Sequence, residues 1–392
     1  MIHLPQGFLF SACAAGLKVS GKPDLAFALA PDGASAAAMF TRNQVAAAPV
    51  IVGREHLRAG KGRIHAVIVN AGNANCATGA PGLKTAKTVC QALASEIHVR
   101  PEQIFPSSTG IIGVPLPVEK ITVALPDLIA VASPDALAAF ASAILTTDTR
   151  IKIASEEIEH RGQKAAIVGV AKGAGMIHPN MATMLVYLFT DVAASPGDLQ
   201  KLLRSAVDQS FNNISVDGDT STNDTVLLLA SSKSGVPLKR IHTQFERALL
   251  NVCRSLAQQI VADGEGVKHV VRLRIEQARS EDEARQIACT IANSPLVKTA
   301  WAGADPNWGR ILAAIGRSGV KIKPEKINIY LGDQQICRKG AANKFNASKA
   351  HEYMSQASYE IRVTLGLGKA SLEFLSCDLT AEYVRINADY ST

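Results

Sequence analysis

The segment Thr183–Asp191 (TMLVYLFTD) constrains the fold more than any other part of the chain, because it is apolar at nearly every position. A strand that alternates apolar and polar residues can leave one face in water, whereas a continuous apolar run has to be covered on both faces. Strand-like runs also occur at Arg63–Asn70 and Gln163–Val170. The sequence therefore predicts sheets that are covered by helices.

Strand-like and helical segments alternate unevenly along the 392 residues. Ile241–Ala262 has the period of a long helix that ends at Asp263–Gly266, and we expect Tyr359–Val363 and Ala370–Phe374 to be paired strands joined by a hairpin turn at Gly366–Lys369. Several strands follow one another without a helix between them, which favours mixed sheets over one doubly wound parallel sheet. The length exceeds what one core usually holds, so the predicted class is α/β (α+β) with two domains.

Composition narrows the classes of function. The net charge is +7, but the basic residues are scattered and are not interleaved with aromatic residues, so we expect no nucleic-acid partner. No apolar run is long enough to span a membrane, and the N-terminus lacks the pattern of a secretion signal. The seven cysteines have no CxxC or zinc-ligand spacing. We expect a cytoplasmic chain with free thiols and no metal.

Familiar catalytic motifs are missing from the sequence. There is no Walker A loop and no G-x-S-x-G turn, which argues against a P-loop enzyme and an α/β-hydrolase. The segment Asp217–Asp224 begins like a calcium loop, but the positions that require Gly and Glu hold Thr222 and Leu228. We interpret the aspartates of this segment as acceptors for loop amides.

The stretch Lys172–Leu185 (KGAGMIHPNMATML) carries the chemistry. A threonine inside a chain has no base beside its hydroxyl and is a poor nucleophile. A cut between Ala182 and Thr183 would give Thr183 a free α-amine, which titrates near pH 8 and can take the proton from its own Oγ. The same hydroxyl could make the cut by attacking the Ala182 carbonyl. Thr183 could equally be an ordinary β-branched strand residue, and periodicity alone does not decide between the two.

The whole chain resembles the ornithine acetyltransferase (glutamate N-acetyltransferase) family of arginine biosynthesis. Gly173–Leu185 matches the cleavage-site signature of that family. Six further matches occur in order along the chain, at Asn70–Asn75, Ser108–Gly113, Thr146–Thr149, Asp217–Thr225, Asp263–Gly266 and Asp305–Arg310, with a last one at Asn387–Thr392. The resemblance implies a two-domain fold with a nucleophile exposed by self-cleavage, and fragments 1–182 and 183–392.

The resemblance also implies roles for individual residues. Thr183 corresponds to the nucleophile, and Thr109 with Gly110 to an oxyanion hole, in which a hydroxyl and a backbone N–H stabilise the tetrahedral intermediate. The implied substrate-binding residues, besides Thr183, are Thr146, Lys172, Glu265, Asn387 and Thr392. Thr147 is an alternative to Thr146, because spacing in this region varies within the family.

The implied reaction moves an acetyl group from N-acetylornithine to glutamate through an acetyl-threonine ester, without a cofactor. The resemblance leaves open whether acetyl-CoA is a second donor, and it implies an assembly of two copies of each fragment (α2β2). The rival hypothesis is a self-cleaving amidohydrolase or aminopeptidase, in which water replaces glutamate. A non-catalytic, basic nucleic-acid-binding protein is a more distant alternative, because the charge is dispersed.

Overall fold

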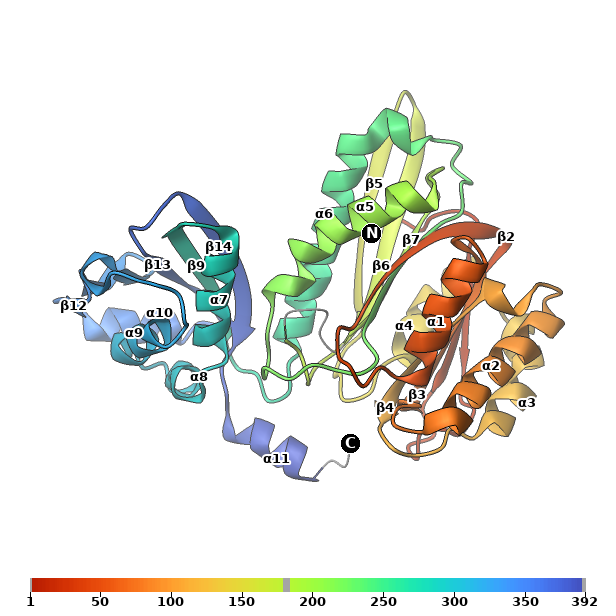
Figure 1. The fold of residues 1–392 in the computed structure, drawn as a ribbon, viewed down its shortest axis with the longest axis horizontal. Coiled ribbons are helices and arrows are strands. Elements are labelled where there is room, and N and C mark those ends of the chain that lie inside the picture. Colours follow the sequence, from red (N-terminus) through yellow and green to blue (C-terminus); the bar gives the residue numbers. More distant parts are fainter. Residues whose placement is uncertain (1, 179–183, 390–392) are drawn as a thin grey trace.

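The computed structural model describes residues 2–178 and 184–389. These residues form two mixed sheets with helices packed on them, as predicted (Figure 1). Ala182, Thr183 and Thr392 lie outside the described residues, so the predicted cleavage site and the last predicted binding residue are not placed.

The first sheet has eight strands in the order β4-β3-β2-β8-β7-β6-β5, with β1 paired to β2. Only the β3–β4 and β7–β8 pairs are parallel. The strands are β1 (Leu9–Cys13), β2 (Leu25–Phe40), β3 (Arg63–Asn73), β4 (Ile104–Ile111), β5 (Lys152–His160), β6 (Gln163–Lys172), β7 (Leu185–Thr190) and β8 (Thr225–Ala230).

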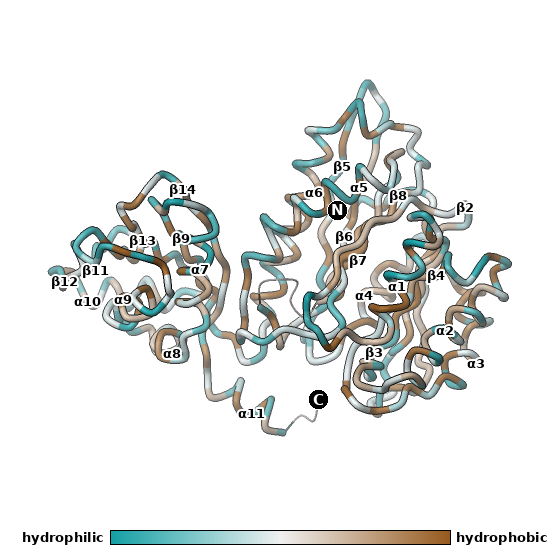
Figure 2. The backbone as a smooth tube through the Cα atoms, in the orientation of Figure 1, coloured by the Kyte–Doolittle hydropathy of each residue, from teal (hydrophilic) through white to brown (hydrophobic). Residues whose placement is uncertain are grey.

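Helices cover both faces of this sheet. They are α1 (Ala48–Ala59), α2 (Gly79–Glu96), α3 (Val118–Ala130), α4 (Leu137–Ala143), α5 (Pro196–Asp208) and α6 (Leu238–Ala262), with short 3-10 turns that include η3 (Phe211–Asn213). On β7, Val186 and Leu188 pack in a core with α5 and α6. Tyr187 and Phe189 face the opposite way, into a core that contains α4. Burial of β7 on both faces is therefore confirmed, and Figure 2 shows the apolar residues running along β6 and β7.

The second sheet has six strands in the order β12-β11-β10-β13-β9-β14 and its own apolar core. The strands are β9 (Val270–Ala278), β10 (Asn328–Leu331), β11 (Gln334–Arg338), β12 (Ala341–Ala342), β13 (Ser358–Thr364) and β14 (Ala370–Cys377). Its helices are α7 (Glu281–Ala292), α8 (Pro295–Ala302), α9 (Trp308–Gly316) and α10 (Ala347–Met354). The last helix, α11 (Ala381–Asp389), leaves this sheet and extends back toward the first sheet (Figure 1).

The predicted pairing of Tyr359–Val363 with Ala370–Phe374 is wrong. These segments lie in β13 and β14, and β9 lies between them, parallel to β13 and antiparallel to β14. The expected hairpin turn instead crosses the end of β9, because Leu367 and Gly368 donate their backbone N–H groups to the carbonyl of Gln277. A strand from 80 residues earlier could not be recognised as the partner from local pattern alone.

Candidate active site

One cavity of about 160 Å³ brings together most of the predicted site residues. Thr109 and Gly110 come from the end of β4, Lys172 from the end of β6, and Glu265 from the loop after α6. The remaining lining residues are Ala74, Ile112, Thr146, Thr147, Gly175, Met176, Asp217, Asp219, Ser221, Thr222, Asn223, Tyr383 and Asn387. Thr146 and its alternative Thr147 both line the cavity, so the structure does not choose between them.

The Thr109–Gly110 end of β4 is held tightly against β3. Gly110 pairs with Gly72 in the parallel register and has φ of +133°, a conformation that side chains rarely adopt. A Cβ at Gly110 would also overlap the backbone of Gly72 and Asn73. Glycine is therefore required at this position by both its own conformation and the close approach of β3.

Asn223 joins this end of β4 to the loop that follows β3. Its side-chain amide donates to the carbonyls of Ser108, at 2.9 Å, and Ala74, at 2.7 Å. Asn223 is buried and lines the cavity. No role for Asn223 was predicted from the sequence, although Asn223 lies in the matched segment Asp217–Thr225.

Another part of the cavity wall is formed by Glu265 and by residues of α11. The Glu265 backbone N–H donates to the Ala174 carbonyl at 3.0 Å, and Glu265 Oε2 accepts from Asn387 Nδ2 at 2.8 Å. Asn387 also donates to the Tyr383 carbonyl at 3.0 Å. A Cβ on Gly175 would overlap the Glu265 carboxylate, so glycine at that position leaves room for this side chain. Asn387 thus belongs to helix α11.

Asp217 organises the loop that leads toward the predicted cut. Its carboxylate accepts backbone N–H groups from Met176 at 2.5 Å, Ile177 at 2.9 Å and Asp219 at 3.2 Å. Burial raises the pKa of Asp217 to about 6, despite the backbone donors that favour the charged form. The prediction that aspartates of this segment accept loop amides is confirmed for Asp217. Its position in the cavity, 3.4 Å from the Tyr383 hydroxyl, was not predicted.

Asp224 holds the chain just beyond the predicted cut. Its Oδ1 accepts the Met184 N–H at 3.0 Å, and Met184 is covalently bonded to Thr183. Burial raises the pKa of Asp224 well above the usual carboxyl range, while nearby Lys172 opposes that shift. Because Asp224 follows the cavity-lining Asn223, this hydrogen bond ties Met184 to the edge of the cavity.

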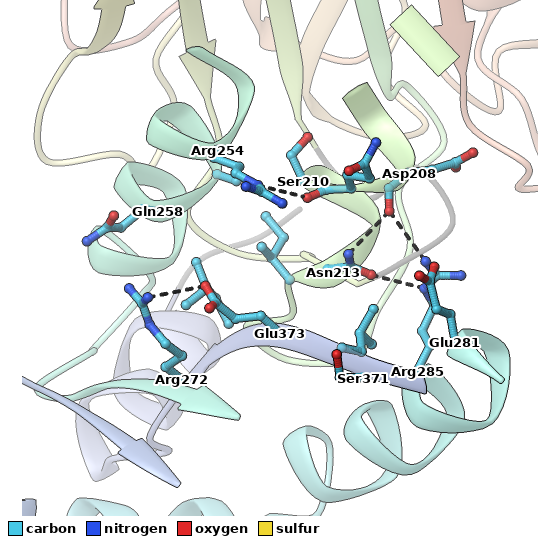
Figure 3. Close-up of a pocket in the computed structure, with 15 residues that line it drawn as sticks. Asp208, Ser210, Asn213, Arg254, Gln258, Arg272, Glu281, Arg285, Ser371 and Glu373 are labelled. Atoms are coloured by element: carbon cyan, nitrogen blue, oxygen red, sulfur yellow. Dashed lines mark hydrogen bonds and ion pairs between the residues drawn. The ribbon is translucent and has the colours of Figure 1, made fainter. Parts of the chain in front are cut away.

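A larger cavity of about 480 Å³ lies between α6 and η3 on one side and β14 and α7 on the other (Figure 3). It contains none of the predicted site residues. Its three arginines already have partners: Arg272 lies 3.2 Å from Glu373, Arg285 donates to Asn213 at 3.0 Å, and Arg254 donates to the Gln209 carbonyl at 3.5 Å. We therefore take the smaller cavity as the candidate active site, because its polar groups come from the motifs that carry the chemistry.

Within residues 2–178 and 184–389, no group of three or more His, Cys, Asp or Glu side chains could hold a metal ion. In the same part of the chain, no helix is long and apolar enough to cross a membrane.

The family model, the similar sequences and a solved structure described below all carry the same family name. The model described as the ArgJ family matches residues 9–392. The arginine biosynthesis bifunctional protein ArgJ of Methylococcus capsulatus is 45% identical and aligns with 98% of this chain and 95% of its own. The protein of the same name from Thermus thermophilus is 44% identical over the full length of both chains. The crystal structure of ArgJ from Bacillus halodurans, at 39% identity and a TM-score of 0.50, covers 52% of this chain and 98% of its own.

Proposed function

This chain belongs to the ArgJ family, and on that premise we propose that Thr183 carries the acetyl group from N-acetylornithine to glutamate as a covalent ester. The protein is an acetyltransferase of arginine biosynthesis. The observation that supports these roles is the convergence of Thr109, Gly110, Lys172 and Glu265 on one cavity, from segments that are far apart in the sequence. Met184, bonded to the proposed nucleophile, is held at its edge by Asp224.

Self-cleavage would generate the nucleophile. The Thr183 hydroxyl attacks the Ala182 carbonyl, the amide C–N bond breaks, and water then hydrolyses the resulting ester to leave a free Thr183 α-amine. The Bacillus halodurans comparison supports this step, because that solved chain corresponds to only about half of the present one. Fragments 1–182 and 183–392 would stay together, since β6 of the first pairs with β7 of the second.

In the transfer reaction, Thr183 Oγ attacks the acetyl carbonyl while its α-amine takes the hydroxyl proton. The Thr109 hydroxyl and the Gly110 N–H stabilise the oxyanion of the tetrahedral intermediate. The C–N bond then breaks, and ornithine leaves with the proton from the α-ammonium. The amine of glutamate attacks the ester and regenerates the free hydroxyl.

The charged residues of the cavity suit amino-acid substrates. The Lys172 ammonium pairs with the substrate α-carboxylate, and the Glu265 carboxylate with the δ-ammonium of ornithine. Asn387 keeps Glu265 in place, and Thr146 or Thr147 adds a hydroxyl at the rim. Thr392 is assigned to substrate binding by resemblance alone, because it lies outside the described residues.

Three further features belong to the same proposal. Acetyl-CoA serves as a second donor, which would account for the word bifunctional in the names of the relatives. The two fragments assemble as α2β2. The enzyme works in the cytoplasm, because all seven cysteines are free thiols, as is usual in a reducing compartment.

Isotope-labelled N-acetylornithine tests the reaction directly. With the purified enzyme and glutamate, we expect the label to appear in N-acetylglutamate in equal amount to the ornithine released, and very little free acetate. Release of labelled acetate without N-acetylglutamate would support the hydrolase alternative instead. Intact mass spectrometry of the same sample should show two fragments divided between Ala182 and Thr183.

A further inference from the structure

A buried cluster of four charged side chains adjoins the cavity, and one of the four, Lys172, lines it. Lys152 Nζ contacts Asp148 Oδ1 and Asp263 Oδ2, each at 2.6 Å, and Lys172 Nζ lies 3.9 Å from Asp148 Oδ2. The exposed fractions of these four side chains are between 0 and 5%. Two cations and two anions therefore share one buried region, and Arg150, whose side chain is 56% exposed, pairs with Asp263 Oδ1 from the solvent side at 3.6 Å.

The cluster joins three of the segments that line the cavity. Asp148 accepts backbone N–H groups from Thr146 at 3.1 Å and from Gly173 at 2.6 Å. Asp263 accepts the backbone N–H and the hydroxyl of Thr149, and it precedes Glu265 by two residues. The loop at residues 146–149, the end of β6 and the turn after α6 are thus tied to one another through buried charges.

The two lysines of the cluster are not equivalent. Lys152 has three acceptors, namely Asp148, Asp263 and the Arg150 carbonyl at 3.4 Å, so all of its ammonium protons have partners. The Lys172 ammonium group donates no hydrogen bond to residues 2–178 or 184–389, and the carboxylate oxygen nearest to it among them, Asp148 Oδ2, is 3.9 Å away. A buried ammonium group with three donors and no acceptor among the described residues is suited to bind an acceptor group of a ligand.

We propose that Asp148, Lys152 and Asp263 are positioning residues that hold Lys172 as the cation of the substrate pocket. Asp148 stabilises the positive charge of Lys172, and the like charge of Lys152 opposes it. This inference rests on the proposed function in one respect, which is that Lys172 binds the substrate carboxylate. Lys152 has no contact with the cavity and acts only through its neighbours.

The electrostatics agree with this arrangement. Burial lowers the pKa of Lys172, Asp148 raises it and Lys152 lowers it, with smaller contributions from Asp224 and Glu265, which raise it. Lys18 is the other cation close enough to interact with Lys172. Burial would raise the pKa of Asp148, but the ammonium groups of Lys172 and Lys152 and the Gly173 N–H together hold it at about 2. Asp148 is therefore charged throughout the working pH range.

Removing one partner or the other should move the pKa of Lys172 in opposite directions. Asp148→Asn removes an anion, so the pKa of Lys172 should fall by about one unit or more. Lys152→Met removes a cation, so the pKa of Lys172 should rise. The double variant Asp148→Asn/Lys152→Met removes one charge of each sign and should return the value toward that of the wild type. A purely structural role for the cluster would give no such opposition.

The rate at which acetic anhydride modifies Lys172, resolved by peptide mass spectrometry as a function of pH, measures this pKa without using enzymatic activity. The high-pH limb of kcat/KM for N-acetylornithine should shift in the same direction as the labelling curve in each variant. Lys164→Met is the matched control, because Lys164 lies at the other end of β6 in an exposed pair with Glu157. The Lys164→Met substitution should shift neither the labelling curve of Lys172 nor the pH profile of kcat/KM.

The outcomes separate the inference from the function on which it rests. Shifts of the same sign in both single variants, or no shift in variants that retain a cooperative thermal transition, would overturn the inference and leave the proposed function intact. If Asp148→Asn does not fold, Lys152→Met alone still tests the predicted rise. A Lys172→Met variant with the kcat/KM of the wild type would overturn the substrate-binding role of Lys172, and with it the inference.

Discussion

The side-chain amide of Asn387 donates a hydrogen bond to Glu265 Oε2 at 2.8 Å, across 122 residues of sequence. Through this contact α11 completes the wall of a cavity whose other residues come from the first sheet and its connecting loops, including the loop after α6. Neither residue alone would identify a site. Together they show that the end of the chain takes part in forming the pocket.

Asn387→Ala should weaken the binding of N-acetylornithine while leaving the folded core intact. A hydrogen bond to a charged group is worth about 1.5 kcal/mol at the low end of its range, so we expect KM to rise roughly tenfold with a smaller change in kcat. Steady-state kinetics check this. Arg385→Ala is the matched control, because Arg385 is exposed and, among the described residues, pairs only with Glu382 of the same helix. An equal effect of both substitutions would indicate a general loss of α11 instead.

Thr183→Ala should remain a single chain and have no transferase activity, because the hydroxyl is required both for the cut and for the ester. Thr183→Ser keeps a hydroxyl and should still be cleaved, at a rate that intact mass spectrometry can follow. An alanine variant that appears as two fragments would mean that another residue or a contaminating protease makes the cut.

Thr109→Ala removes one of the two proposed oxyanion donors. Loss of one such donor typically lowers kcat about 100- to 1000-fold, with little effect on ground-state binding. Thr109→Ser retains the hydroxyl and should lose far less activity. Single-turnover measurement of acetyl-enzyme formation locates the effect in the chemical step. A defect that appears only in KM would argue for a binding role of Thr109.

Gly110→Ala should destabilise the protein more than Gly113→Ala does. Both glycines have positive φ, which costs an alanine about 1–2 kcal/mol, but only at Gly110 would the new Cβ also overlap the backbone of β3. A Cβ at Gly113 meets nothing within 4 Å. Chemical denaturation of the two variants gives the comparison. Equal losses of unfolding free energy in the two variants would mean that β3 can move away from the new Cβ without a cost in stability.

Asp217 should make stability depend on pH between about 4 and 6. Because burial raises its folded-state pKa to about 6 from an ordinary value of 3.8, the folded state binds the proton more tightly than the unfolded state does. Its ionisation therefore removes stability as the pH rises through this window. Asp217→Asn cannot ionise, so the Tm of the variant minus that of the wild type should become more positive from pH 4 to pH 7. Differential scanning calorimetry at several pH values measures this difference, and a constant value would contradict the expectation.

Local features of the molecule were predictable because they depend on neighbouring residues. The apolar run at β7 requires cover on both faces, and the structure supplies it from two separate cores. The long helix α6 follows from its apolar period, and its end at Asp263 agrees with the predicted break. The family relationship was also visible, since it rests on short ordered motifs.

The sequence by itself determined which segments become strands and helices, and which residue carries the covalent chemistry that we propose. Tertiary structure alone decided which distant groups meet. It inserted β9 between β13 and β14, joined Asp148 to Asp263 through Lys152, and placed Tyr383 beside Asp217. The physical reason is the distance along the chain over which each effect acts. Backbone preferences and periodicity depend on residues that are only a few positions apart. Strand order and buried ion pairs depend on how whole elements pack, and no local pattern records that.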